Sequence, residues 1–246
     1  ADLMQKLRGA GGSKVNISVF RRGKKELLDF TIQRGKIPNY SIDAVYMMDD
    51  SVGYIKISRF AATTFAEYKQ AFDSLNVLGM RRLIIDLRDN PGGYLKAATA
   101  LADEFLPDNE LIVYTKGKAR PEEDYFSTSK GSFEKGKIVV LINEGSASAS
   151  EILAGALQDL DRATIIGRRS FGKGLVQEQS TFPDGSALRL TIARYYTPSG
   201  RCIQKSYKEG MEAYDNDLND RYKHGELESI DSIKFPDSLK FKTRSG

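Results

Sequence analysis

KIVVLINEGSASASEILAGALQDL, residues 137–160, is the stretch that decides the fold class. Residues 138–142 are continuously apolar, which is typical of a buried strand, and we expect that strand to end at Asn143. From Ser148 onward the apolar side chains recur at helical spacing. A buried strand that passes through a short turn into a helix is the repeating unit of an α/β protein.

The same alternation extends on both sides of this stretch. The spacing of apolar residues predicts strands over residues 52–60, 81–90, 110–116 and 163–169, and helices over residues 65–78 and 94–106. A strand pair over residues 175–182 and 187–196 follows, joined by a turn at Pro183, Asp184 and Gly185. Strands that alternate with helices favour a parallel sheet, in which ligands bind at the carboxyl ends of the strands.

Two segments flank this body. Residues 1–36 hold nine Lys/Arg and three Asp/Glu and predict a short helix and two strands, which is too little for a self-sufficient domain. Their basic run of Arg21, Arg22, Lys24 and Lys25 can contact nucleic acid, but it is more typical of a solvated hairpin turn. Residues 201–246 balance nine basic against nine acidic residues, and we expect a surface extension with one helix.

Composition excludes several classes of protein. Apolar residues make up 40% and charged residues 28% of the 246 residues, which excludes disordered, collagenous and membrane-spanning chains. The single cysteine, Cys202, excludes an internal disulfide, and the single histidine, His224, excludes a two-histidine metal site. The first residues carry no secretory signal pattern, so we expect any export signal to lie upstream.

A serine-rich turn joins the decisive strand to its helix. A serine at a helix N-terminus lies beside unpaired backbone N–H groups, which can hold the oxyanion formed when a hydroxyl attacks a carbonyl. Ser148 occupies that place. The segment from Ser148 to Glu151 also fits the capping box S-x-x-E, which merely starts a helix. The turn alone leaves both interpretations open.

A second turn offers a base for that serine. Gly167–Lys173 fits the GxxxxGK part of a phosphate-binding loop, but Gly174 stands where magnesium needs Ser or Thr, and β-rich sequence follows. A solvated loop lysine is the plainer alternative. Lys173 can instead take the serine proton if burial or a neighbouring cation favours its uncharged form. Glycines on both sides of Lys173 let another segment approach, and Gln177 can aim the amine.

The third turn contains glycines after a buried strand. Gly92 and Gly93 can present a backbone N–H with no side chain in the way, although an ordinary turn before a helix also fits. Two rival sites are weaker. Cys202 has no histidine near it in sequence, and Asp86 and Asp89 are surrounded by residues that do not bind metal.

Three motifs together resemble the carboxy-terminal processing proteases, also called tail-specific proteases. They are IDLRDNPGG at residues 85–93, NEGSASASEILAGALQD at residues 143–159 and GRRSFGKGLVQ at residues 167–177. The resemblance covers residues 43–200 as the catalytic core. Residues 1–36 resemble the last part of a PDZ domain, residues 37–42 form a linker, and residues 201–246 resemble the charged extension of the Bacteroides-type members.

The resemblance implies a mechanism and a fold. It assigns the nucleophile to Ser148, the base to Lys173 25 residues later, and the orientation of the lysine to Gln177. The oxyanion would be held by the backbone N–H groups of Gly93 and Ala149. No metal or organic cofactor is implied. The expected fold is a crotonase/Clp-protease-like α/β core of ββα units with a mixed sheet.

The function implied is that of a serine endopeptidase that cleaves proteins or peptides near their C-termini. Its partners would be substrates with accessible C-termini outside the cytoplasm, with no nucleic acid and no integral membrane segment. The resemblance also leads us to expect further PDZ sequence before Ala1 and a further core strand after Gly246. The alternatives are a non-catalytic peptide-binding module and a nucleotide-binding ATPase that uses Gly167–Lys173.

Overall fold

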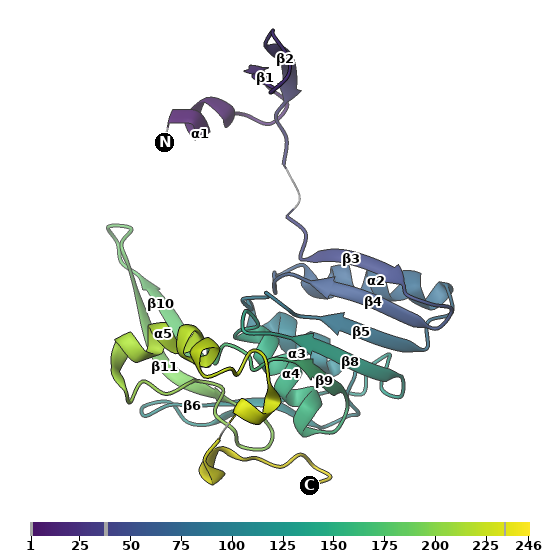
Figure 1. Cartoon of the computed structure of the whole chain (residues 1–246), viewed down its shortest axis with the longest axis vertical. Helices are drawn as coiled ribbons and strands as arrows, with labels where there is room; N and C mark the ends of the chain where they lie inside the picture. Colours follow the sequence, from purple (N-terminus) through teal and green to yellow (C-terminus); the bar gives the residue numbers. More distant parts are fainter. Residues whose placement is uncertain (1, 37–38, 234) are drawn as a thin grey trace. The chain divides into compact units, whose positions relative to one another are not determined.

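Two units make up the chain, residues 1–39 and residues 40–246, and the computed structural model describes residues 2–36, 39–233 and 235–246 (Figure 1). In the first unit, α1 (Asp2–Leu7) precedes an antiparallel hairpin of β1 (Lys14–Val19) and β2 (Leu28–Gln33). Large apolar side chains such as Leu3 and Phe20 are exposed there, because one helix and two strands enclose no interior.

The second unit is built on a mixed five-stranded sheet. Its order is β3-β4-β5-β8-β9, with β3 antiparallel to β4 and the other pairs parallel. The strands are β3 (Ile42–Met47), β4 (Val52–Ile57), β5 (Arg82–Asp86), β8 (Lys137–Ile142) and β9 (Thr164–Gly167). The α/β class with a mixed sheet is therefore confirmed. β3 begins at Ile42, the last residue of the linker predicted over residues 37–42, and residues 37 and 38 lie outside the described residues.

Three helices lie on one side of this sheet (Figure 1). They are α2 (Thr64–Val77), α3 (Leu95–Asp103) and α4 (Ala149–Asp159). Alternate strand residues such as Leu83, Ile85 and Val140 are buried against them, whereas Ile84 and Val139 between them are only half-buried. The apolar runs thus have one fully buried face, and α4 lies at the centre of the core with nearly every residue buried.

A second, four-stranded sheet is antiparallel throughout. Its order is β10-β11-β6-β7, and its strands are β6 (Leu111–Lys116), β7 (Glu123–Phe126), β10 (Leu175–Thr181) and β11 (Ala187–Tyr196). The prediction that β6 continues the parallel sheet is wrong, because β6 pairs with the distant β11. The β10–β11 hairpin extends away from the rest of the unit (Figure 1).

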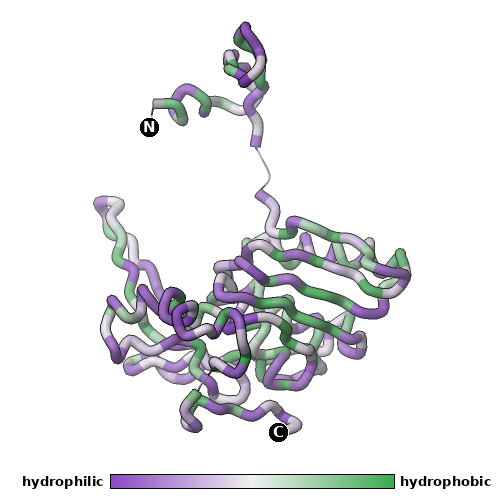
Figure 2. The backbone as a smooth tube through the Cα atoms, in the orientation of Figure 1, coloured by the Kyte–Doolittle hydropathy of each residue, from purple (hydrophilic) through white to green (hydrophobic). Residues whose placement is uncertain are grey.

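The last segment packs on the same unit. It contains α5 (Gly210–Lys223) and two short 3-10 turns at Ile230–Ser232 and Asp237–Leu239. Near the end of the chain, Arg244 pairs with the carboxylate of Glu110 and donates its N–H to the carbonyl of Asp159. Figure 2 shows apolar residues along the five-stranded sheet and a largely hydrophilic α5. Among the described residues, no helix combines the length and the apolar character needed to cross a membrane.

Candidate active site

The serine turn runs from the end of β8 to the start of α4. Ser148, immediately before the helix, has φ 57° and ψ −114°. A non-glycine residue at positive φ is strained, and such strain gathers at functional sites. Buried neighbours fix the turn: the Ser146 hydroxyl donates to the carbonyl of Leu87 at 2.7 Å, and the Ser150 hydroxyl donates to that of Asn90 at 3.0 Å. The strained backbone is thus held from both sides.

The glycine turn packs directly on the serine turn. Asn90 is fully buried, and its side chain donates to the carbonyl of Ile57 and accepts from the N–H of Gly92. At Gly92, where φ is +92°, a Cβ would lie 2.5 Å from the carbonyl oxygen of Ala147 and 2.7 Å from the Cβ of Ser148. Only glycine allows this approach.

The backbone N–H groups of Gly93 and Ala149 are the oxyanion donors that the family resemblance implies. Within residues 39–233, neither N–H donates one of the hydrogen bonds that the structure contains. Gly93 adopts φ +150°, and a Cβ there would overlap the carbonyl of Phe60, to which Tyr94 donates its N–H. A larger residue at Gly93 would therefore break this contact as well as disturb the free N–H.

Lys173 lies in residues 168–174, which we call the lysine loop, between β9 and β10. The glycines that flank it are required by close packing. A Cβ on Gly172 would lie 2.9 Å from the Cβ of Lys205, and one on Gly174 would lie 2.5 Å from the backbone nitrogen of Gln204. The prediction that these glycines admit another segment is confirmed, and that segment is residues 203–205.

The carboxylate of Glu151 joins the serine turn to the lysine loop. Its Oε2 accepts the backbone N–H of Ser148 and the backbone N–H of Lys173, each at 2.8 Å. Its Oε1 accepts the N–H of Gly172 and the hydroxyl of Ser170, each at 2.7 Å. Two residues 25 positions apart in sequence are thereby attached to a single oxygen atom. The capping-box pattern detected Glu151, but it gave no sign of the contacts with the loop.

Glu151 sits in an unusual electrostatic environment. Only 7% of the residue is exposed, and burial raises the pKa of its carboxyl group, although the four hydrogen bonds oppose that rise. No salt bridge reaches it from the residues that the structure describes. The backbone N–H groups and the positive end of the α4 dipole take the place of a counter-ion.

Gln177 and Lys173 both have exposed side chains. Lys173 follows the carbonyl of Gly172 in the lysine loop, and its side chain is open to solvent. Gln177 is also exposed, and its amide donates to the hydroxyl of Thr191 at 3.4 Å. Among the described residues, no hydrogen bond joins Gln177 to Lys173, and a bulge lies between Val176 and Gln177 in β10. The orientation of Lys173 by Gln177 stays a prediction.

The rival sites are also resolved by their surroundings. Gly167–Lys173 leads into strand β10, whereas a phosphate-binding loop must open a helix, so the nucleotide-binding interpretation is wrong. The carboxylate of Asp86 accepts hydrogen bonds from the guanidinium group of Arg88 and the hydroxyl of Tyr54. Arg88 is thus its cationic partner in place of a metal. His224 is exposed and follows the last residue of α5.

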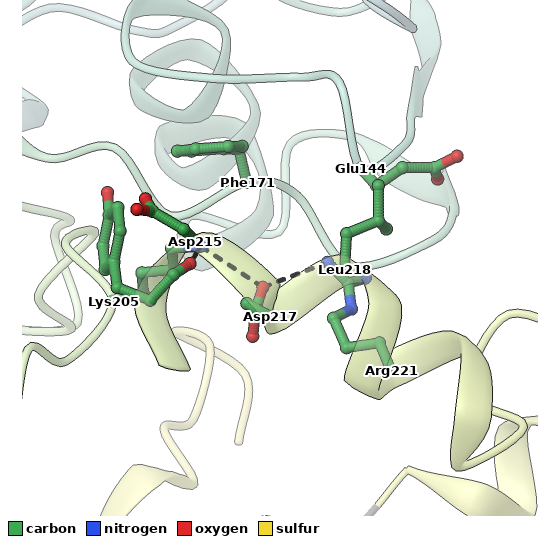
Figure 3. Close-up of a pocket in the computed structure, with 8 residues that line it drawn as sticks. Glu144, Phe171, Lys205, Asp215, Asp217, Leu218 and Arg221 are labelled. Carbon is green, nitrogen blue, oxygen red and sulfur yellow. Dashed lines mark hydrogen bonds and ion pairs between the residues drawn. The ribbon is translucent and has the colours of Figure 1, made fainter. Parts of the chain in front are cut away.

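Two pockets border the turns. The first has a volume of about 230 Å³ and separates the lysine loop from α5 (Figure 3). There the amine of Lys205 lies over the rings of Phe171 and Tyr214 and 3.5 Å from the carboxylate of Asp217. The second, of about 420 Å³, lies at the carboxyl ends of the parallel strands and is lined by Lys56, Arg88, Asp89, Ile142, Asn143, Gly167 and Arg168.

Comparison with known proteins gives a consistent result. Residues 51–212 match the model of peptidase family S41. The chain is 38% identical over 205 residues to the carboxyl-terminal-processing protease of Synechocystis sp., covering 81% of the chain and 47% of that relative. It is 40% identical over 208 residues to the carboxy-terminal-processing protease of Bartonella bacilliformis, covering 82% and 47% respectively.

A solved structure agrees with these sequences. The photosystem II D1 C-terminal processing protease superposes with a TM-score of 0.61 at 31% identity, over 82% of this chain and 56% of that one. The chain spans about half the length of the curated relatives it matches.

Proposed function

The chain belongs to peptidase family S41, and on that premise we propose that it is a serine endopeptidase with Ser148 as nucleophile and Lys173 as general base. The observation that carries this proposal is the Glu151 carboxylate, which accepts one hydrogen bond from each of these two backbones. A Ser–Lys pair is a known variant of nucleophile activation, and it needs the two residues on adjacent, rigid turns.

Each group has a distinct role in the proposed reaction. The Ser148 hydroxyl attacks the peptide carbonyl while the amine of Lys173 takes its proton and later passes it to the leaving amine. The negative charge that forms on the carbonyl oxygen faces the free N–H groups of Gly93 and Ala149. The N-terminus of α4 adds the positive end of its dipole at the same place.

The substrate class follows from the relatives. The relatives from Synechocystis and Bartonella and the photosystem II D1 processing protease are named for processing carboxyl termini. We extend this to the chain and propose that it cleaves proteins or peptides with accessible C-termini, near those termini and outside the cytoplasm. Ser148 is only partly buried and Lys173 is exposed, so both are open to an extended peptide.

Hydrolysis of a fluorogenic peptide by three variants tests the assignment. We expect Ser148→Ala to reduce kcat by about a thousandfold or more, because the nucleophile is gone. Lys173→Arg should do nearly the same, since a guanidinium keeps its proton at the working pH. His224→Ala is the matched control and should keep full activity. Loss of activity in His224→Ala together with full activity in Lys173→Arg would contradict the assignment.

A further inference from the structure

We propose that Gln204 is a positioning residue for Lys173, holding the peptide bond that follows the lysine so that its side chain is aimed at Ser148. This inference rests on the proposed function. Gln204 lies outside the three turns and carries no group suited to the chemistry itself. It acts through the backbone of the lysine loop.

The first observation is a buried hydrogen bond next to Lys173. Gln204 is 9% exposed, and its side-chain oxygen accepts the backbone N–H of Gly174, which is buried, at 2.9 Å. Glu151 accepts the N–H of Lys173 itself at 2.8 Å. One carboxylate therefore fixes the peptide plane before the Lys173 Cα, and one amide fixes the plane after it. The two planes together set the direction of the Cα–Cβ bond.

The second observation is that the Gln204 amide has a defined orientation. Its nitrogen donates to the carbonyl of Lys205 at 3.1 Å and to the hydroxyl of Tyr214 in α5 at 3.3 Å. These acceptors direct the amide oxygen toward Gly174. Beside it, the N–H of Lys205 donates to the carbonyl of Gly172 at 2.9 Å. Residues 203–205 thus bind the lysine loop on both sides of Lys173.

The loss of this acceptor has a predictable consequence. A buried N–H without a partner is costly, so the loop would shift until Gly174 reached water. Misplacing a catalytic group by about 1 Å can cost on the order of a hundredfold in rate. Peptide binding does not use Gln204, so kcat should change much more than KM.

The experiment compares three variants of the full chain. Gln204→Leu removes the acceptor at similar volume, and Gln204→Glu keeps an acceptor oxygen. Gln158→Leu is the matched control, because the side chain of Gln158 in α4 accepts a hydrogen bond from Arg201 in the wild-type chain. Peptide hydrolysis gives kcat and KM, thermal unfolding reports the fold, and hydrogen–deuterium exchange by mass spectrometry follows residues 172–176.

We expect Gln204→Leu to lower kcat by about tenfold or more, with KM within about twofold of wild type. The backbone amide hydrogens of residues 172–176 should exchange faster than in wild type. Gln204→Glu should recover part of kcat, because its second oxygen cannot donate to the carbonyl of Lys205 as the amide nitrogen does. Gln158→Leu should match wild type. A folded Gln204→Leu variant with the kcat of wild type would overturn the proposal. So would a loss of kcat that merely equals the loss of folded protein and that Gln204→Glu does not reverse. If residues 172–176 exchange at the wild-type rate in Gln204→Leu, the inference that Gln204 positions the backbone at Gly174 is refuted. A wild-type chain that cleaves no peptide would contradict the proposed function and the catalytic part of this inference.

Discussion

A single buried carboxylate organises the candidate site at the scale of residues. Glu151 accepts four hydrogen bonds from the serine turn and the lysine loop, and it does so without a cationic partner among the described residues. Strain at Ser148 is tolerated because the surrounding bonds over-determine its backbone. The chemistry assigned to two residues therefore depends on a third that need not touch the substrate.

Glu151→Gln tests this dependence. An amide offers one acceptor oxygen, so about two of the four donors lose their partner, and hydrogen bonds to charged groups contribute about 1.5–3 kcal/mol each. We expect the free energy of unfolding to fall by about 3 kcal/mol and kcat by about tenfold or more. Urea titration and peptide hydrolysis measure the two effects.

Glu144→Gln serves as the control for that variant. Glu144 belongs to the same turn, but its carboxylate pairs with the half-exposed Arg168, and exposed pairs contribute little. Its stability and activity should stay close to wild type. Equal behaviour of the two variants would show that Glu151 has no special role.

Motifs predicted the nucleophile and base candidates but missed the residues that hold them. Ser148 and Lys173 stand in short, recognisable patterns. The contacts of Glu151 with the lysine loop and of Gln204 with Gly174 span 19 to 30 positions in sequence. The spacing of residues along one helix or strand does not indicate contacts with residues so far away in sequence. The orientation of Lys173 by Gln177 that the family resemblance implies stays a prediction.

The periodicity of apolar residues predicted most helices and strands, but it did not predict which strands belong to the same sheet. The helices α2, α3 and α4 and the strands β4, β5, β8 and β9 occur where apolar spacing indicated. β6 has the same local pattern as the parallel strands, yet it pairs with β11 about 80 positions later. β7 has only four residues, which is too short for alternation to be recognised.

Neighbouring strands of the mixed sheet share a buried charge at Asp86. This residue ends β5, has no exposed surface, and accepts hydrogen bonds from Tyr54 of β4 and from Arg88. Burial pushes the pKa of Asp86 upward, but the bonds from Arg88 and Tyr54 outweigh it and lower the pKa to about 2. The ionised form is therefore favoured in the folded state.

Asp86 should make stability depend on pH in acid. Because its pKa is lower in the folded than in the unfolded chain, its contribution is present above about pH 4 and is lost as the pH falls toward 2. That contribution is on the order of 2 kcal/mol. Urea unfolding should show a difference in the free energy of unfolding between wild type and Asp86→Asn that is constant from pH 5 to 7. Below pH 4 this difference should decrease by about 2 kcal/mol. A difference that does not change with pH would contradict the prediction.

At the scale of the whole molecule, the two units differ in whether they contain a hydrophobic core and the candidate catalytic residues. Residues 40–246 contain the hydrophobic core and all three candidate turns. In residues 1–39, the described part is one short helix and one hairpin with exposed apolar side chains. A groove that captures a peptide carboxylate needs a strand edge and a backbone nest facing a helix, which is more than these elements provide.

We therefore predict little preference of this chain for a free C-terminus. Two fluorogenic peptides, identical except that one ends in a carboxylate and the other in an amide, should be cleaved with similar kcat/KM. A preference of about tenfold for the free acid, or about 1.4 kcal/mol, would place carboxylate recognition in residues 40–246.

Covalent labelling with a fluorophosphonate probe, followed by mass spectrometry of the digested chain, tests the Ser148–Lys173 pair most directly. We predict one adduct, on the peptide that contains Ser148, absent in Ser148→Ala and formed much more slowly in Lys173→Arg, because the hydroxyl needs its base. An adduct on a different residue of the wild-type chain, or labelling that persists unchanged in Ser148→Ala, would contradict the assignment of the nucleophile.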